Sequence, residues 1–238
     1  GGAEKSGAER PAPAGKDKAE ARARDASPAP EGPGGMDALS AHLDRGWDLL
    51  HKHDYRGAKR SAEQVLTIDE RSPEGYVLLG AIAAAEGHPR DALQHYEHAM
   101  HLDPGFLDPL LYAAETYIWP LGECEQAITL CEQALDLAEE EDEYLDALLL
   151  KAEAELGVGD FEASRRTLND LPEVDMPEGL YHLRAARTLM ELGALKEAEV
   201  HFKRAYAKDD QLSDALHGLG LCAEERGDRD EMVKLFLE

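Results

Sequence analysis

Apolar and small residues recur at helical spacing along most of the chain, most regularly between residues 73 and 106. A Gly-His-Pro turn there separates two apolar stripes, each about one helix long. The first stripe contains Tyr76, Leu79, Gly80 and Ala83, and the second contains Ala92, Tyr96 and Ala99. Because neither helix can bury its apolar side alone, the pattern predicts an antiparallel hairpin that packs against neighbouring hairpins. Gly80 and Ala92 are small where the helices must approach closely, and Tyr96 fills the space beside them.

The same pattern recurs along the chain at a nearly fixed period. Each second helix has one anchor position, and the anchors are Ala58, Ala92, Ala127, Ser164, Ala198 and Met232. They lie 34, 35, 37, 34 and 34 residues apart. A period of this length indicates a helical repeat array.

The period contains a small-x6-Gly motif and an Ala-x3-aromatic-x2-Ala motif, which resemble the tetratricopeptide repeat family over about 200 of the 238 residues. The resemblance implies an all-α, right-handed superhelical solenoid of antiparallel helix pairs. The copies would cover residues 39–72, 73–106, 107–141, 145–178, 179–212 and, incompletely, 213–238.

Residues 1–35 differ in composition from the rest of the chain. They are rich in Ala, Gly and Pro, show no apolar periodicity, and carry six basic and six acidic residues. We expect a flexible linker here, followed by the array over 36–238.

Several places depart from the regular repeat. An extra residue falls within Ile118-Trp119-Pro120-Leu121, where the third hairpin should turn. Ser164 replaces the anchor alanine of the fourth copy, whose second helix should be cut short by Pro172. The acidic run 139–143 is expected to be a solvated connector; the alternatives are a joint between two three-repeat halves or a docking site for a basic segment.

The chain is strongly acidic. Its 25 basic and 50 acidic residues give a formal net charge of −25. A phosphate-binding face needs clustered Lys and Arg, so nucleic-acid binding is disfavoured and a basic protein partner is the natural complement. No apolar run is long enough to span a membrane.

No enzyme signature is present, and we expect neither catalytic residues nor a cofactor. His95, His98 and His101 could bind a metal weakly, but the inward stripe of their helix predicts that they form a solvated polar face. The three cysteines, Cys124, Cys131 and Cys222, are expected to be unpaired and buried. We therefore predict no metal site.

The resemblance implies a concave groove lined by the first helix of each copy. The predicted partner-binding residues are Leu43, Trp47, Val77, Ala81, Leu111, Tyr112, Glu115, Leu149, Glu153, Arg184 and Arg187. Trp47 is the expected hot spot for an apolar helix or peptide. Two alternatives remain open: part of the apolar stripe is inter-repeat core, and Arg184 and Arg187 form structural ion pairs instead of binding an acidic group.

These patterns predict a non-enzymatic interaction scaffold or assembly factor for a partner with an apolar or basic segment. The Gly1-Gly2 start and the Ala/Pro linker resemble the tether of a bacterial envelope lipoprotein, and small repeat lipoproteins of that kind assist pilus or secretin assembly. This favours the cell envelope over the cytoplasm, with a possible N-terminal lipid anchor. The alternative is the substrate-selecting repeat arm of a larger enzyme or signalling protein.

Overall fold

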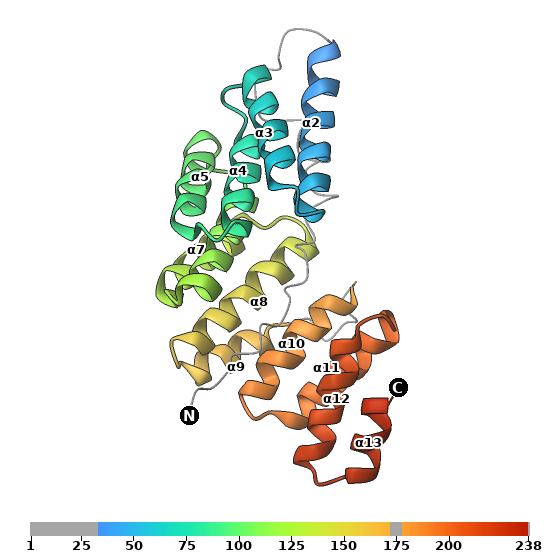
Figure 1. Ribbon diagram of the computed structural model, residues 1–238. Coiled ribbons are helices and arrows are strands. Elements are labelled where there is room, and N and C mark those ends of the chain that lie inside the picture. Colours follow the sequence, from blue (N-terminus) through green and yellow to red (C-terminus); the bar gives the residue numbers. More distant parts are fainter. Residues whose placement is uncertain (1–32, 172–177, 238) are drawn as a thin grey trace, which may run out of the picture. The chain divides into compact units, whose positions relative to one another are not determined.

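The computed structural model describes residues 33–171 and 178–237, and all regular elements among them are helices (Figure 1). The chain divides into two compact units, one ending at Pro104 and the other beginning at Gly105. Most of the expected linker, residues 1–32, lies outside the described residues, and the first described helix begins at Pro33.

The first unit contains two helical hairpins. Its helices are α2 (Pro33–His51), α3 (Tyr55–Ile68), α4 (Pro73–Ala85) and α5 (Pro89–Leu102). Within each hairpin the two helices pack along each other, and α3 and α2 also contact α4 (Figure 1). Ser72 caps α4 by accepting a hydrogen bond from the Gly75 amide at 3.2 Å, and Pro73 follows at the first helical position.

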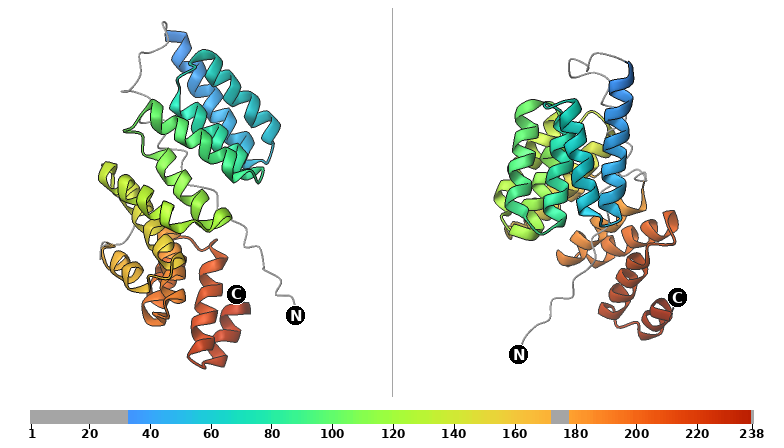
Figure 2. Two further views of the ribbon diagram at one scale, coloured as in Figure 1. Left: turned by 90° about the vertical axis from the view of Figure 1, so that its left-hand side faces the viewer. Right: turned by 45° about the horizontal axis from the view of Figure 1, so that its top comes forward.

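The second unit continues the pairing of helices. Its elements are α6 (Asp108–Thr116), the π-helix η1 (Tyr117–Leu121), α7 (Cys124–Leu137), α8 (Glu141–Gly157), α9 (Phe161–Asn169), α10 (Gly179–Glu191), α11 (Leu195–Lys208), α12 (Ser213–Glu225) and α13 (Arg229–Leu237). The packed hairpins are α6 with α7, α8 with α9, α10 with α11 and α12 with α13. Figure 2 shows these hairpins from two further sides.

Close helix approach within the hairpins depends on glycine. A Cβ atom at Gly80 would overlap the ring of Tyr96, which is almost completely buried. Gly218 of α12 has the same relationship to Phe202 of α11. The predicted pairing of Gly80 with Tyr96 is therefore confirmed.

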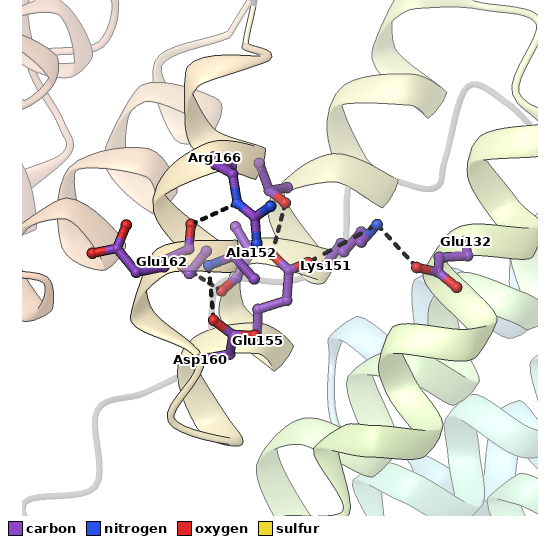
Figure 3. Close-up of polar contacts among 10 residues, drawn as sticks. Glu132, Lys151, Ala152, Glu155, Asp160, Glu162 and Arg166 are labelled. Atoms are coloured by element: carbon purple, nitrogen blue, oxygen red, sulfur yellow. Dashed lines mark hydrogen bonds and ion pairs between the residues drawn. The ribbon is translucent and has the colours of Figure 1, made fainter.

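The anchor positions form the centre of the packing. Ala58, Ala92, Ala127, Ser164 and Ala198 have no solvent exposure, and Met232 is partly exposed. The Ser164 hydroxyl donates a 2.8 Å hydrogen bond to the Ala152 carbonyl oxygen, in the same contact region as Thr167, which donates to Glu155 at 2.7 Å (Figure 3). A hydroxyl at the anchor is thus satisfied by the facing helix, as a buried polar group requires.

The third hairpin absorbs its extra residue in a short π-helix. Segment η1 contains Pro120, and it ends at Gly122, which adopts a left-handed conformation with φ 68°. The Glu123 amide then donates to the Tyr117 carbonyl at 2.9 Å, a turn wider than that of an α-helix. Helix α7 can therefore begin in the normal orientation.

The acidic run is the start of α8, within the second unit. Glu143 is buried, and its carboxylate accepts hydrogen bonds from the amides of Glu139 at 3.1 Å and Glu140 at 3.4 Å. Acidic side chains are favourable at a helix N-terminus, where the backbone amides are unpaired. The division of the chain falls instead between Pro104 and Gly105, so the expectation of a joint at 139–143 is wrong.

Candidate functional site

The first helices of consecutive hairpins contact one another in each unit. Helix α2 contacts α4 in the first unit, and α6, α8, α10 and α12 follow one another in the second. We call the surface formed by the sides of these helices that face away from their own hairpin partners the first-helix face of each unit. The predicted partner-binding residues lie on these helices.

In the first unit most of the predicted residues are interior. Leu43, Val77 and Ala81 have exposed fractions of 6%, 2% and 8%. Trp47 packs against the same core as Leu43 but remains partly exposed. The alternative of inter-repeat core therefore holds for the three aliphatic residues, and Trp47 is the one of the four that remains accessible.

In the second unit the predicted residues also separate into two groups. Leu149 is completely buried in the core. Leu111, Tyr112 and Glu115 on α6 are partly exposed. The remaining residues, Glu153, Arg184 and Arg187, are partly exposed and form ion pairs.

Arg184 connects α8 and α10 through two carboxylates. Its Nε lies 3.1 Å from Glu153 Oε1, and its Nη1 lies 3.3 Å from Asp146 Oδ1. Two buried atoms of this arrangement, Glu153 Oε2 and Arg184 Nη2, have no hydrogen-bond partner. Burial lowers the pKa of Arg184, but the negative charges of Glu153, Asp146 and Glu115 outweigh it and raise the pKa above its ordinary value.

Further carboxylates surround Tyr181, one turn before Arg184. The Tyr181 hydroxyl donates to Asp146 Oδ2 at 3.5 Å, the long limit of a hydrogen bond. Burial raises the pKa of Tyr181, and the charges of Asp146, Asp142 and Glu178 raise it further. We call Glu115, Asp142, Asp146, Glu153 and Glu178 the acidic cluster; against its five carboxylates stands the single guanidinium of Arg184.

The second predicted arginine is also engaged within the protein. Arg187 on α10 forms an ion pair with Asp214 on α12, and both side chains are exposed. Arg184 and Arg187 thus form structural ion pairs between successive first helices, the alternative considered for them. Neither side chain is free to bind an acidic partner group in this arrangement.

Asp146, Tyr181 and Asp214 were missed by the sequence analysis, although the repeat period contains a signal for two of them. Tyr112, Asp146 and Tyr181 are 34 and 35 residues apart and occupy equivalent places on α6, α8 and α10. Applying the period to Tyr112 would have predicted both of the others. Asp214 begins α12 and carries no comparable signal.

A buried histidine pair lies between α10 and α11. His182 has no solvent exposure, and its Nδ1 lies 3.1 Å from Nδ1 of His201, so one ring donates and the other accepts. Burial lowers the pKa of His201 to about 4, helped by the positive charges of His182 and Arg204. The sequence gave no periodic signal for this pair.

The histidines considered as metal ligands lie on the outer side of α5. His98 and His101 are exposed, and the His98 ring lies 4.1 Å from the ring of Tyr76. Burial lowers the pKa of His95, with Asp91 opposing the shift. Within residues 33–171 and 178–237, no group of three His, Cys, Asp or Glu side chains is arranged to hold a metal ion.

A search of the described helices for a membrane span found none that combines the necessary length and apolar character.

No protein-family model matches the sequence, and no curated protein matches it. Solved structures match it in fold. PilF of Pseudomonas aeruginosa has a TM-score of 0.68 at 17% identity, covering 86% of this chain and 91% of that protein. PilW, described as a widely conserved type IV pilus biogenesis factor, has a TM-score of 0.66 at 18% identity, covering 83% and 90%.

A third similar structure is a thermophilic tetratricopeptide repeat protein of Thermus thermophilus. Its TM-score is 0.65 at 17% identity, over 77% of this chain and 98% of that protein. At such identities the likeness establishes the fold. Together with the helical hairpins and their anchors, it shows that the chain has the all-helical repeat fold of tetratricopeptide repeat proteins.

Proposed function

We propose that the chain is a non-enzymatic protein-interaction scaffold that holds a segment of a partner protein on its first-helix faces. The observation that carries this proposal is the acidic cluster on the second unit. Five carboxylates converge there around one arginine and one tyrosine, on the helices that line the binding groove in this fold.

The charge of the cluster selects the chemistry of the partner. Arg184 neutralises one of the five carboxylates, so the cluster keeps a negative potential. A segment with Lys or Arg side chains complements it, and the net charge of −25 steers such a segment toward the protein. Affinity should therefore fall as salt is added.

Apolar contacts supply the rest of the proposed binding. Trp47 in the first unit, and Leu111 and Tyr112 in the second, are partly exposed and can bury area against a partner. Leu43, Val77, Ala81 and Leu149 support these surfaces from the interior. Glu115 is the accessible carboxylate closest in sequence to the apolar pair on α6.

A role in assembling a bacterial envelope machine is the finer form of the proposal. Its support is the fold shared with PilF and with PilW, the latter a type IV pilus biogenesis factor by its description. An N-terminal lipid anchor would fit such a role, and a lipidated cysteine before Gly1 in the precursor would support it. The competing role is a substrate-selecting arm within a larger enzyme or signalling protein, which the full reading frame would reveal.

Binding to a defined peptide tests the proposal directly. The probe is a fluorescein-labelled peptide that alternates leucine with arginine, compared with a version in which glutamate replaces arginine. We expect the arginine peptide to bind, and the variants Trp47→Ala, Leu111→Ala and Glu115→Gln to weaken its binding about 3- to 30-fold, in the range of about 1–2 kcal/mol per contact.

The matched control is Glu63→Gln, an exposed carboxylate on the second helix α3. Circular dichroism confirms that each variant is folded. Equal affinity of all variants for the arginine peptide, or tighter binding of the glutamate peptide, would show that the first-helix faces do not bind a basic partner.

A further inference from the structure

The turns of two neighbouring hairpins in the second unit expose large apolar side chains. Trp119 is 47% exposed in η1, and Val158 and Phe161 are 42% and 57% exposed in the turn from α8 to α9. Among the described residues the exposed large hydrophobic side chains are Trp119, Tyr144, Val158, Phe161, Val200 and Val233. Half of them therefore lie in these two turns.

The two turns lie at the same end of adjacent hairpins. Segment η1 contacts α8, and a Cβ atom at Gly157 would overlap the sulfur of Cys124, the first residue of α7. Trp119 is five residues before Cys124, and Phe161 is four residues after Gly157. We call Trp119, Pro120, Val158 and Phe161 the turn patch.

The hairpins do not require these residues for their packing. Ala85 lies 34 residues before Trp119 at the corresponding end of α4, where alanine is sufficient. Within η1, Ile118 is buried whereas Trp119 and Pro120 are exposed, so the π-helix directs the larger apolar side chain outward. Exposed aromatic residues gathered in one place are characteristic of interaction surfaces, where Trp often dominates the binding energy.

Acidic residues surround the turn patch. Glu123 and Glu125 follow η1, and Asp160 and Glu162 lie on either side of Phe161. Arg166 and Arg165 lie farther along α9, where Arg165 forms an ion pair with Glu197. The patch is thus apolar with a negative rim.

The rim restricts what can cover the patch. A second copy of the chain would bring a surface with the same negative rim, and an anionic membrane would also be repelled. A partner segment with apolar side chains flanked by Lys or Arg matches both features. Because the patch extends over two turns, an amphipathic helix with anchors on one side is the form that covers it best.

We propose that the turn patch is a second interaction surface, separate from the first-helix faces, which binds a basic amphipathic helix of a partner protein. Trp119 and Phe161 are its apolar anchors, and Glu123, Glu125, Asp160 and Glu162 hold the basic flanks of that helix. The scaffold would then be able to hold two different partner segments at once.

The test uses a fluorescein-labelled helical peptide with leucine on one side and lysine on the other, and a scrambled peptide of the same composition. Anisotropy is measured on the full chain and on the variants Trp119→Ala and Phe161→Ala. The matched control is Val200→Ala on α11, because Val200 is exposed to the same fraction, 47%, as Trp119. Trp47→Ala reports separately on the first-helix face.

We expect the amphipathic peptide to bind at least tenfold more tightly than the scrambled one. The Trp119→Ala and Phe161→Ala variants should each lose at least fivefold in affinity, and Val200→Ala and Trp47→Ala should lose less than twofold. Equal affinities for the turn-patch and control variants would overturn the proposal.

Two further measurements decide between other occupants of the patch. Sedimentation velocity of the full chain compares the oligomeric state with that of Trp119→Ala, and flotation measures binding to vesicles of phosphatidylcholine and phosphatidylglycerol. A dimer that Trp119→Ala dissociates, or vesicle binding that it abolishes, would overturn the proposal in favour of self-association or a lipid surface. Monomeric protein that does not float supports it.

Discussion

Arg184 Nε lies 3.1 Å from Glu153 Oε1 across the boundary between two successive hairpins, and both side chains are largely buried. An arginine in this position holds α8 and α10 together while it neutralises part of a cluster of carboxylates. Removing it should leave Glu153 and Asp146 as buried charges without compensation.

We predict that Arg184→Met destabilises the protein by about 3–5 kcal/mol, the cost typical of breaking a buried ion pair from one side. Urea denaturation followed by circular dichroism measures the change. Arg187→Met is the matched control, because its pair with Asp214 is exposed, and it should cost about 0–1 kcal/mol. Adding Glu153→Gln and Asp146→Asn to Arg184→Met should restore part of the lost stability; no recovery would contradict a charge-based explanation.

Gly80→Ala should destabilise the first unit although alanine is the better helix former. The added Cβ overlaps the Tyr96 ring, and overpacking of this kind costs about 1–3 kcal/mol, more than the gain of up to about 1 kcal/mol in helix propensity. The double variant Gly80→Ala/Tyr96→Leu relieves the overlap. Its loss in thermal denaturation should therefore be smaller than the sum of the two single losses, and strict additivity would argue against direct contact.

The histidine pair makes stability depend on pH. Because the pKa of His201 is about 4 in the folded protein and 6.5 in its ordinary state, only the unfolded chain takes up this proton as the pH falls below 6.5. The contribution of His201 is thus complete above pH 6.5 and is lost progressively between 6.5 and about 4. We predict that His201→Gln flattens the decline in unfolding free energy within this window.

The exposed residue His53 provides the control for that experiment. His53→Asn should keep the slope of the parent chain between pH 6.5 and 4. If His201→Gln and the parent chain show the same slope, the buried pair is not the titrating group.

The cysteines should react slowly with thiol reagents in the folded protein. Cys131 is fully buried, and burial together with the charge of Glu153 raises its pKa to about 12; burial also raises the pKa of Cys124 and Cys222. The thiolate is the reactive form, so Cys131 should be the slowest of the three at pH 8. Labelling with 5,5′-dithiobis(2-nitrobenzoate), located by mass spectrometry, measures the order, and fast labelling of Cys131 would contradict this burial.

The fold could be predicted from the sequence because it depends on local, repeated requirements. Gly80 and Tyr96 must fit one another, and small anchors such as Ala92 must recur at the same place in each hairpin. Such requirements leave a period of about 34 residues in the sequence. The spacing of the anchors therefore carried the architecture, including the place of the irregular third hairpin.

The candidate site was less predictable because side chains on one helix face divide between core and surface. Leu149 and Leu111 have the same apolar character, yet Leu149 is fully buried and Leu111 is partly exposed. Burial of this kind depends on the neighbouring hairpin, which the period alone does not describe. The partners of Arg184 likewise come from an adjacent helix, more than 30 residues away in sequence.

The π-helix η1 also bears on how such an array can change in length. It takes up one additional residue within a single turn, and the anchor Ala127 that follows is still fully buried. An insertion or deletion at this kind of turn therefore stays local and does not alter the phase of later repeats. Evolution and protein engineers alike can add a side chain to the rim of a helical array at such a point without redesigning its interior.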